Sequence, residues 1–301
     1  MRIVGIHGVG NYLPESATQA AQSKAAAWLS AIQRSEHLDR SGTEVDLRIA
    51  YYAHLLQPSG RQGASELDSD AIDMWHAFVT DYLPRQPQGP IRSVLHHASA
   101  VMARALGLNE RAAVSFLELF FREVATFLRT EGNFAPKQHI LARVGSMIAG
   151  ADVIVAHSLG SLVAYEALWK YRTEVPLLVT LGSPLAMPMI FPRLTPKPVE
   201  NLGSRPPGVQ RWVNIADPED FVAIPRLGVS RRFRNVDEDC HDSVKTVLRH
   251  EVDKYLQGAE FARTLNSMAS KSSASSQGIS KVGSGWCLCW PGPQLEQRFP
   301  R

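Results

Sequence analysis

Short apolar runs alternate with amphipathic stretches along the first part of the chain. Residues 2–6 form an apolar run that stops at a glycine turn, and residues 16–33 carry apolar side chains at helical spacing. A second run, 45–56, is rich in β-branched and aromatic residues and is typical of a strand. This alternation of strand and helix predicts an α/β fold, with a mostly parallel central sheet flanked by helices.

The same alternation returns in the second half of the chain. The pattern there predicts strands at 151–156, 176–182 and 209–215 and helices at 159–172 and 250–266. The segment 184–207 contains seven prolines and is predicted to be an irregular loop.

Residues 65–150 interrupt the alternation, because they show helical patterns with no convincing strand between them. We interpret this segment as a helical cap inserted into one domain that spans 1–266. Its clearest helix lies at 110–130 and has a wide apolar face. The segment 267–285 holds eight serines, so we expect 267–301 to be a disordered tail rich in serine and glycine.

The charge balance argues against several classes of function. The chain has 32 basic and 29 acidic residues and a formal net charge of +3, which is too small and too scattered for a nucleic-acid-binding surface. No apolar stretch reaches the roughly 20 residues of a membrane helix, and no secretion signal precedes the first strand. We therefore expect a soluble, cytoplasmic protein without a transmembrane segment. The three cysteines give no disulfide framework, and the pair His96 and His97 lacks a third ligand for a metal.

The most informative pattern lies where the strand at 151–156 ends. It reads Ala156, His157, Ser158, Leu159, Gly160 and leads directly into a helical pattern. A small residue two positions before and after a serine, between a strand and a helix, is typical of a nucleophile elbow, where the hydroxyl projects above the sheet. The alternative interpretation is a serine that only caps the helix.

A second pattern could complete the chemistry of an activated serine. An acyl-transfer enzyme needs N–H donors for the oxyanion of its tetrahedral intermediate. The turn His7, Gly8, Val9, Gly10 follows the first strand, so we assign the N–H groups of Val9 and Leu159 as the two donors of an oxyanion hole. A phosphate-binding glycine turn is the alternative, although the three-glycine spacing of dinucleotide-binding proteins is absent.

The segments "IHGVG", "AHSLG" and "NIADPEDFVAIP" resemble, in order and position, those of the α/β-hydrolase family, in particular its lipase- and esterase-like serine hydrolases. The resemblance covers roughly residues 1–262. It implies an α/β-hydrolase fold, a catalytic triad in the chain order serine, aspartate, histidine, and no metal or organic cofactor. It also implies a compact core that carries an inserted cap.

This order leaves two candidates for each remaining member of the triad. The acid is Asp220 or Asp217, and we favour Asp220 because it precedes a segment that re-enters the fold, whereas Asp217 is suited to a turn. The base is His250 or His241. We favour His250 because it precedes an amphipathic helix, whereas His241 lies in an acidic run typical of a solvated turn.

Together these patterns predict a serine hydrolase that cleaves a carboxylic ester, with a small-molecule or lipid ester or thioester as substrate, through a covalent acyl-serine. Amides and peptides are possible substrates by the same chemistry. A non-catalytic binding protein with the same fold remains an alternative from a different class. The aromatic face at 116–128 either lines an acyl pocket or packs as ordinary core.

Overall fold

A six-stranded sheet forms the centre of the molecule. The computed structural model describes residues 1–39, 44–57, 68–82, 90–105, 109–132, 135–243 and 250–277. The sheet has the order β2-β1-β3-β4-β6-β8, and every pairing described within it is parallel. This confirms the α/β class. The strands are β1 (Arg2–Ile6), β2 (Asp46–Ile49), β3 (Val153–His157), β4 (Val175–Leu181), β6 (Val209–Ala216) and β8 (Glu238–His241).

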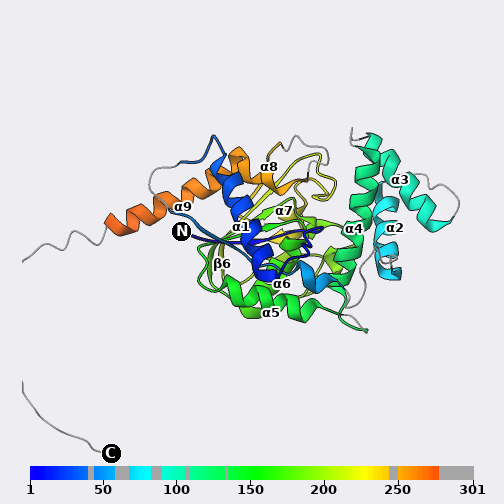
Figure 1. Cartoon of the computed structure of the whole chain (residues 1–301), viewed down its shortest axis with the longest axis horizontal. Coiled ribbons are helices and arrows are strands. Elements are labelled where there is room, and N and C mark those ends of the chain that lie inside the picture. Colours follow the sequence, from blue (N-terminus) through cyan, green and yellow to red (C-terminus); the bar gives the residue numbers. More distant parts are fainter. Residues whose placement is uncertain are drawn as a thin grey trace, which may run out of the picture.

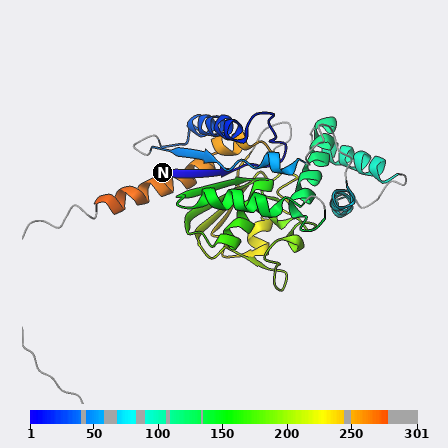
Figure 2. The same ribbon diagram turned by 60° about the horizontal axis from the view of Figure 1, so that its bottom comes forward.

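Helices cover both faces of this sheet (Figures 1 and 2). Because successive side chains of a strand point to opposite faces, Ile3 packs in one apolar cluster and Val4 and Ile6 pack in the other. The cluster around Ile3 includes side chains of α1 (Ala17–Gln33), α8 (Val252–Gln257) and α9 (Ala259–Gln277). The opposite cluster includes side chains of α5 (Lys137–Ile148) and α6 (Leu159–Tyr171).

Three helices form a bundle at one end of the molecule: α2 (Ser69–Tyr82), α3 (Ile91–Ala105) and α4 (Glu110–Leu128). Figure 2 shows β1 running from the N-terminus towards this bundle, so the bundle lies beyond the carboxyl ends of the strands. Aromatic rings pack in its centre: the ring centroid of Phe121 lies 5.3 Å from that of Phe78 and 6.4 Å from that of Trp75. The predicted insertion therefore has two parts, because α5, its last helix, covers the sheet instead of joining the bundle.

The structure differs from the prediction in two segments, the run at 45–56 and the proline-rich loop at 184–207. The run at 45–56 ends as a strand at Ile49 and continues as the 3₁₀ helix η1 (Ala53–Leu56). The segment 184–207 contains 3₁₀ turns η2 (Pro184–Ala186) and η3 (Phe191–Arg193), and the short strand β5 (Gly203–Ser204), which pairs with β7 (Phe233–Arg234). Prolines fit these turns because each lies in the first positions of a helical turn, where no N–H is needed.

The acidic run before His241 is a strand, which corrects its interpretation as a surface turn. It forms β8, the edge strand beside β6. Its acidic side chains are paired: Glu238 contacts Arg211 and Arg263, and the Asn214 amide donates to Asp239 Oδ1 at 2.7 Å. These partners offset the repulsion between the acidic side chains, so the run can form a strand beside β6. The helix α7 (Gly228–Arg232) precedes it.

The final helical segment is longer than predicted and is divided at Gly258. The helix α9 continues to Gln277, past the expected boundary at 266, because extending an existing helix adds one hydrogen bond for each residue fixed. The expected disordered tail thus begins with helix, and its remainder at 278–301, with Cys287 and Cys289, lies outside the described residues. In the described part of the chain, no helix combines the length and apolar character that crossing a membrane requires.

Candidate active site

Ser158 lies at a strained turn between β3 and α6. Its φ of 54° and ψ of −128° place a non-glycine residue in the left-handed half of backbone space, which costs about 1–3 kcal/mol. The turn is tight because α6 passes close to β1: a Cβ on Gly160 would lie 2.2 Å from the carbonyl oxygen of Ile6. A strained serine between a strand and a helix is typical of a nucleophile elbow.

The sheet order places this turn beside the glycine turn that follows β1. The chain passes from β1 to β2 on one side and then crosses back to β3 on the other, so the order of strands reverses between β1 and β3. In open parallel sheets, ligands bind outside the carboxyl ends of the strands at such a reversal. Ser158 and Gly8 meet there, since a Cβ on Gly8 would lie 2.6 Å from that of Ser158.

The structure brings Asp220 and His250 into direct contact. The Nδ1 of His250 is 2.7 Å from Oδ2 of Asp220, and both side chains are buried. The same carboxylate accepts hydrogen bonds from the Tyr255 hydroxyl at 2.8 Å and from the Val222 N–H at 2.8 Å. A carboxylate held in this way fixes the imidazole with its proton on Nδ1, so that Nε2 can accept one.

The competing candidates occupy different positions. Asp217 Oδ1 accepts the Glu219 N–H at 2.7 Å, which is a local turn contact. Its own N–H donates to the Tyr255 hydroxyl at 2.8 Å, so Asp217 supports the site through its backbone. His241 ends β8 with an exposed side chain, whereas His250 is buried beside Asp220. The favoured pair is thus the one that the fold assembles.

His157, the residue before Ser158, holds the backbone of His250. Its Nε2 donates to the His250 carbonyl oxygen at 3.0 Å, and the two ring centroids are 4.7 Å apart. Burial lowers the pKa of His157 well below its usual value, so the ring is neutral and carries its proton on Nε2 for this bond. Because His157 and Ser158 are consecutive, this bond ties the candidate base to the turn that bears the candidate nucleophile.

Two polar atoms of the site are buried without a partner. Among the described residues, neither Ser158 Oγ nor His250 Nε2 has a hydrogen-bond partner. An unsatisfied buried polar atom costs about 1–3 kcal/mol, so such atoms are uncommon in native proteins and call for an explanation. A catalytic role explains both atoms, since the hydrogen bond between a nucleophile and its base is often loose before substrate binds.

The turn after β1, which is the candidate oxyanion hole, is held by hydrogen bonds to its backbone. The Gly8 carbonyl oxygen accepts from His7 Nδ1 and from Asn11 Nδ2, each at 2.9 Å, which fixes the plane of the peptide bond between Gly8 and Val9. Since the N–H of a trans peptide points opposite to its carbonyl, the direction of the Val9 N–H is fixed too. Leu159 is the first residue of α6, so its N–H has no acceptor within the helix.

His7 stabilises this turn as a neutral ring. Burial lowers the pKa of His7 to about 3, so Nδ1 carries the proton and Nε2 accepts the Tyr52 N–H at 3.2 Å. The Tyr52 ring stacks on the imidazole with centroids 4.2 Å apart, and its hydroxyl donates to the His7 carbonyl at 2.6 Å. This packing keeps the turn rigid.

The bundle helix α4 contacts the site directly. The ring of Phe116 lies edge-on to His250, with centroids 5.4 Å apart, and 5.6 Å from the ring of Phe221. The predicted aromatic face at 116–128 is thus divided. Phe120 and Phe127 are fully buried, and Phe127 lies beside the Lys137 ammonium group, so Phe116 is the aromatic residue of α4 seen to touch the candidate triad.

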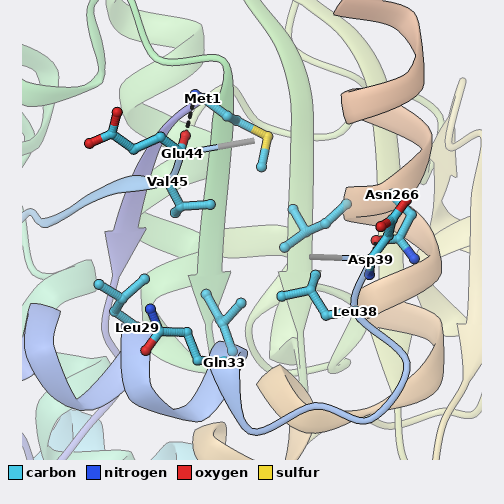
Figure 3. A pocket seen from close by; sticks show the side chains of 10 residues that line it. Met1, Leu29, Gln33, Leu38, Asp39, Glu44, Val45 and Asn266 are labelled. Atoms are coloured by element: carbon cyan, nitrogen blue, oxygen red, sulfur yellow. Dashed lines mark hydrogen bonds between the residues drawn. The ribbon is translucent and has the colours of Figure 1, made fainter. Parts of the chain in front are cut away.

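A pocket of about 560 Å³ lies at the other end of the sheet (Figure 3). Met1 and Val45, which precede β1 and β2, line it together with Leu29 and Asn266. It therefore lies at the amino ends of the strands, whereas Ser158 follows the carboxyl end of β3. This pocket is not part of the candidate active site.

Sequence reasoning missed the residues that support the site. Tyr255 binds the loop after β6, and Glu123 binds the turn after β1. Such long-range contacts leave no periodic pattern in a sequence. One signal was available for Glu123, because a carboxylate on the apolar face of a predicted helix is out of place.

Comparisons with family models, curated proteins and solved structures found no match. The resemblance of "IHGVG" and "AHSLG" to the α/β-hydrolase family therefore stays a prediction. What this chain does must be inferred from the geometry and chemistry of its own residues.

Proposed function

We propose that this chain is a serine hydrolase with an α/β-hydrolase fold, which cleaves carboxylic esters through an acyl-serine intermediate. One observation carries the proposal. Ser158 lies at a strained strand-to-helix turn directly after His157, and the ring of His157 hydrogen-bonds the backbone of His250 in the buried Asp220–His250 pair. Among the described residues, neither the Oγ of Ser158 nor the Nε2 of His250 has a hydrogen-bond partner. These features support nucleophilic catalysis because each costs stability, and a catalytic role explains why the fold keeps it.

The residues suggest a conventional order of steps. His250 Nε2 accepts the proton of Ser158 as Oγ attacks the ester carbonyl carbon, and the N–H groups of Val9 and Leu159 stabilise the resulting oxyanion. The C–O bond to the alcohol then breaks, and the imidazolium returns its proton to the leaving oxygen. Asp220 stabilises the charged ring. Water, deprotonated by Nε2, then attacks the acyl-serine, and the acid leaves as Ser158 recovers its proton.

The surroundings of Ser158 favour an apolar acyl group. Ser158 is fully buried, and Phe116 and Phe221 pack beside its candidate base. Substrate must therefore enter by displacing part of the cover, and α4 is the element that contributes Phe116. Movement of such a cap would also exclude water once substrate is bound.

Covalent labelling tests this function. A fluorophosphonate probe phosphonylates an activated serine, and we expect it to modify the wild-type protein on the peptide that contains Ser158. The S158A variant should not be labelled. Ser99 is a matched control, since it is also fully buried but lies in α3, where its hydroxyl accepts a hydrogen bond from Trp75; S99A should be labelled like the wild type. A folded wild-type protein that resists the probe, or labelling that persists in S158A, would contradict the proposal.

A further inference from the structure

Glu123 is a buried carboxylate that the reaction steps above do not use. It lies on α4, is 3% exposed, and accepts the Gly10 N–H on Oε2 at 3.1 Å. Gly10 belongs to the turn that presents the Val9 N–H. A side chain of the bundle therefore binds the backbone of the candidate oxyanion hole, across 113 residues of sequence.

The spacing of α4 explains how one helix reaches both halves of the site. Phe116, Leu119 and Glu123 lie at positions i, i+3 and i+7, which share one face of a helix. Phe116 contacts His250, and a Cβ on Gly10 would lie 3.0 Å from Leu119 Cδ2. This face of α4 therefore contacts the candidate base at one end and the glycine turn at the other.

Glu123 and Asn11 bind the two polar groups of one peptide bond in the turn. Asn11 Nδ2 donates to the Val9 carbonyl oxygen at 2.8 Å, and Glu123 accepts the N–H at the other side of the same peptide bond. Both polar groups of the peptide between Val9 and Gly10 are therefore held. Gly10 has a φ of 68°, a conformation that glycine adopts readily, so this external bond helps to select it.

We propose that Glu123 is a positioning residue, which binds the Gly10 N–H and so keeps in place the turn that presents the Val9 N–H. The inference rests on the proposed function. Burial raises the pKa of Glu123 to about 7, while the hydrogen bond from the Gly10 N–H and the charge of Arg122 lower it. The hydroxyls of Tyr51 and Tyr52 also interact with Glu123 electrostatically.

Kinetics of two substitutions test the role. E123Q keeps an acceptor oxygen, whereas E123L keeps the volume and removes the acceptor. With p-nitrophenyl butyrate we expect E123L to lower kcat by about 10- to 100-fold, the scale of a weakened oxyanion donor, with KM changed less than about threefold. E123Q should keep kcat within about threefold. Glu110 is the matched control on α4, because it is half-exposed at the helix start and paired with Arg104, and E110Q and E110L should match the wild type.

The outcome separates positioning from simple packing. Rescue of kcat by Gln but not by Leu supports positioning. Equal kcat in E123L and wild type, or equal losses in both variants, would overturn it. If E123L does not fold, amide NMR of the wild type and E123Q, described next, still tests whether Glu123 binds the Gly10 N–H.

Amide NMR of Gly10 tests the contact without relying on catalysis. In the wild type we expect the Gly10 N–H chemical shift to titrate with a midpoint near pH 7, and this titration should vanish in E123Q. A Gly10 signal that does not titrate would overturn the inference. If Gly10 titrates while the fluorophosphonate probe fails to label Ser158, the contact is real but the proposed function fails, and Glu123 then positions no oxyanion hole.

Discussion

The backbone at Ser158 is fixed by close approaches on both sides of the residue. A Cβ on Gly8 would meet the Ser158 side chain, and Gly160 brings α6 against the Ile6 carbonyl, so the turn cannot relax without moving β1 or α6. Strain of this kind persists only where the surrounding structure enforces it. The strain at Ser158 can be measured separately from its chemistry.

We expect S158G to be more stable than S158A by about 1 kcal/mol. Both variants lack the hydroxyl, but glycine adopts a φ of 54° without the strain of about 1–3 kcal/mol, which exceeds its own entropic cost of about 0.5–1 kcal/mol. Urea unfolding of the two variants measures the difference. Equal stability, or a more stable S158A, would show that the turn is not strained.

Tyr255 connects the two aspartates of the loop after β6. Its hydroxyl accepts the Asp217 N–H and donates to Asp220 Oδ2, and burial keeps its pKa well above 10, so it remains a donor. We expect Y255F to lower kcat about tenfold and to leave the fold intact, because Asp220 loses one of the groups that orient it. Ester hydrolysis and a thermal melt check this, with Y171F, an exposed tyrosine at the end of α6, as control. Unchanged kcat would exclude a role for Tyr255.

The raised pKa of Glu123 predicts how stability depends on pH. Between about pH 4.5 and pH 7 the folded protein keeps the proton on Glu123 and the unfolded chain has lost it, so the folded state binds more protons. Its contribution to the free energy of unfolding is therefore complete at low pH and is lost as pH rises through this range. We expect the stability of E123Q relative to wild type to increase by up to about 3 kcal/mol from pH 4.5 to pH 8.

Denaturant unfolding at several pH values, with E110Q as control, measures this trend. Glu110 is only partly buried, and its hydrogen bond from Arg104 lowers its pKa, so its substitution should give no such increase. A constant difference between E123Q and wild type across this range would contradict the assignment of a high pKa to Glu123.

Among the elements, α4 is the bundle helix that contacts the candidate active site. Phe116 contacts His250 and Phe221, whereas Phe127 is fully buried near Lys137. Periodicity showed that this helix has an aromatic face but could not show which ring faces the site, because that depends on how α4 packs on the turn after β1. Contacts between elements far apart in sequence have no local signature.

If the proposed function holds, we expect F116A to shift the preference of the protein towards esters with longer acyl chains. Removing the ring opens space beside His250, and a single pocket contact is worth about 1–3 kcal/mol in kcat/KM. A series of p-nitrophenyl esters from acetate to decanoate measures the profile. F127A should lose stability but keep the wild-type profile, because its ring lies in the core. An unchanged profile in F116A would show that α4 does not select the substrate.

For the whole molecule, buried strands and the strand-turn-helix at Ser158 could be predicted because their patterns are local. The edge strand β8 could not, since its acidic residues are paired with Arg211 and Arg263 from other elements. The sequence left Asp220 and Asp217 as alternatives, and only the fold shows that Asp220 contacts His250. The sheet order brings the glycine turn and Ser158 together, because β1 and β3 are parallel neighbours whose carboxyl ends lie at the same edge.

Trapping the acyl-enzyme is the most direct test of the central claim, that Ser158 is a nucleophile activated by His250. A p-nitrophenyl ester is mixed with the protein, the reaction is stopped with acid within the first turnover, and the digested protein is analysed by mass spectrometry. We predict a burst of nitrophenol close to one per protein molecule and an acyl group on the peptide that contains Ser158, both absent in S158A. Ester cleavage that leaves Ser158 unmodified, or that continues in S158A, would contradict the account.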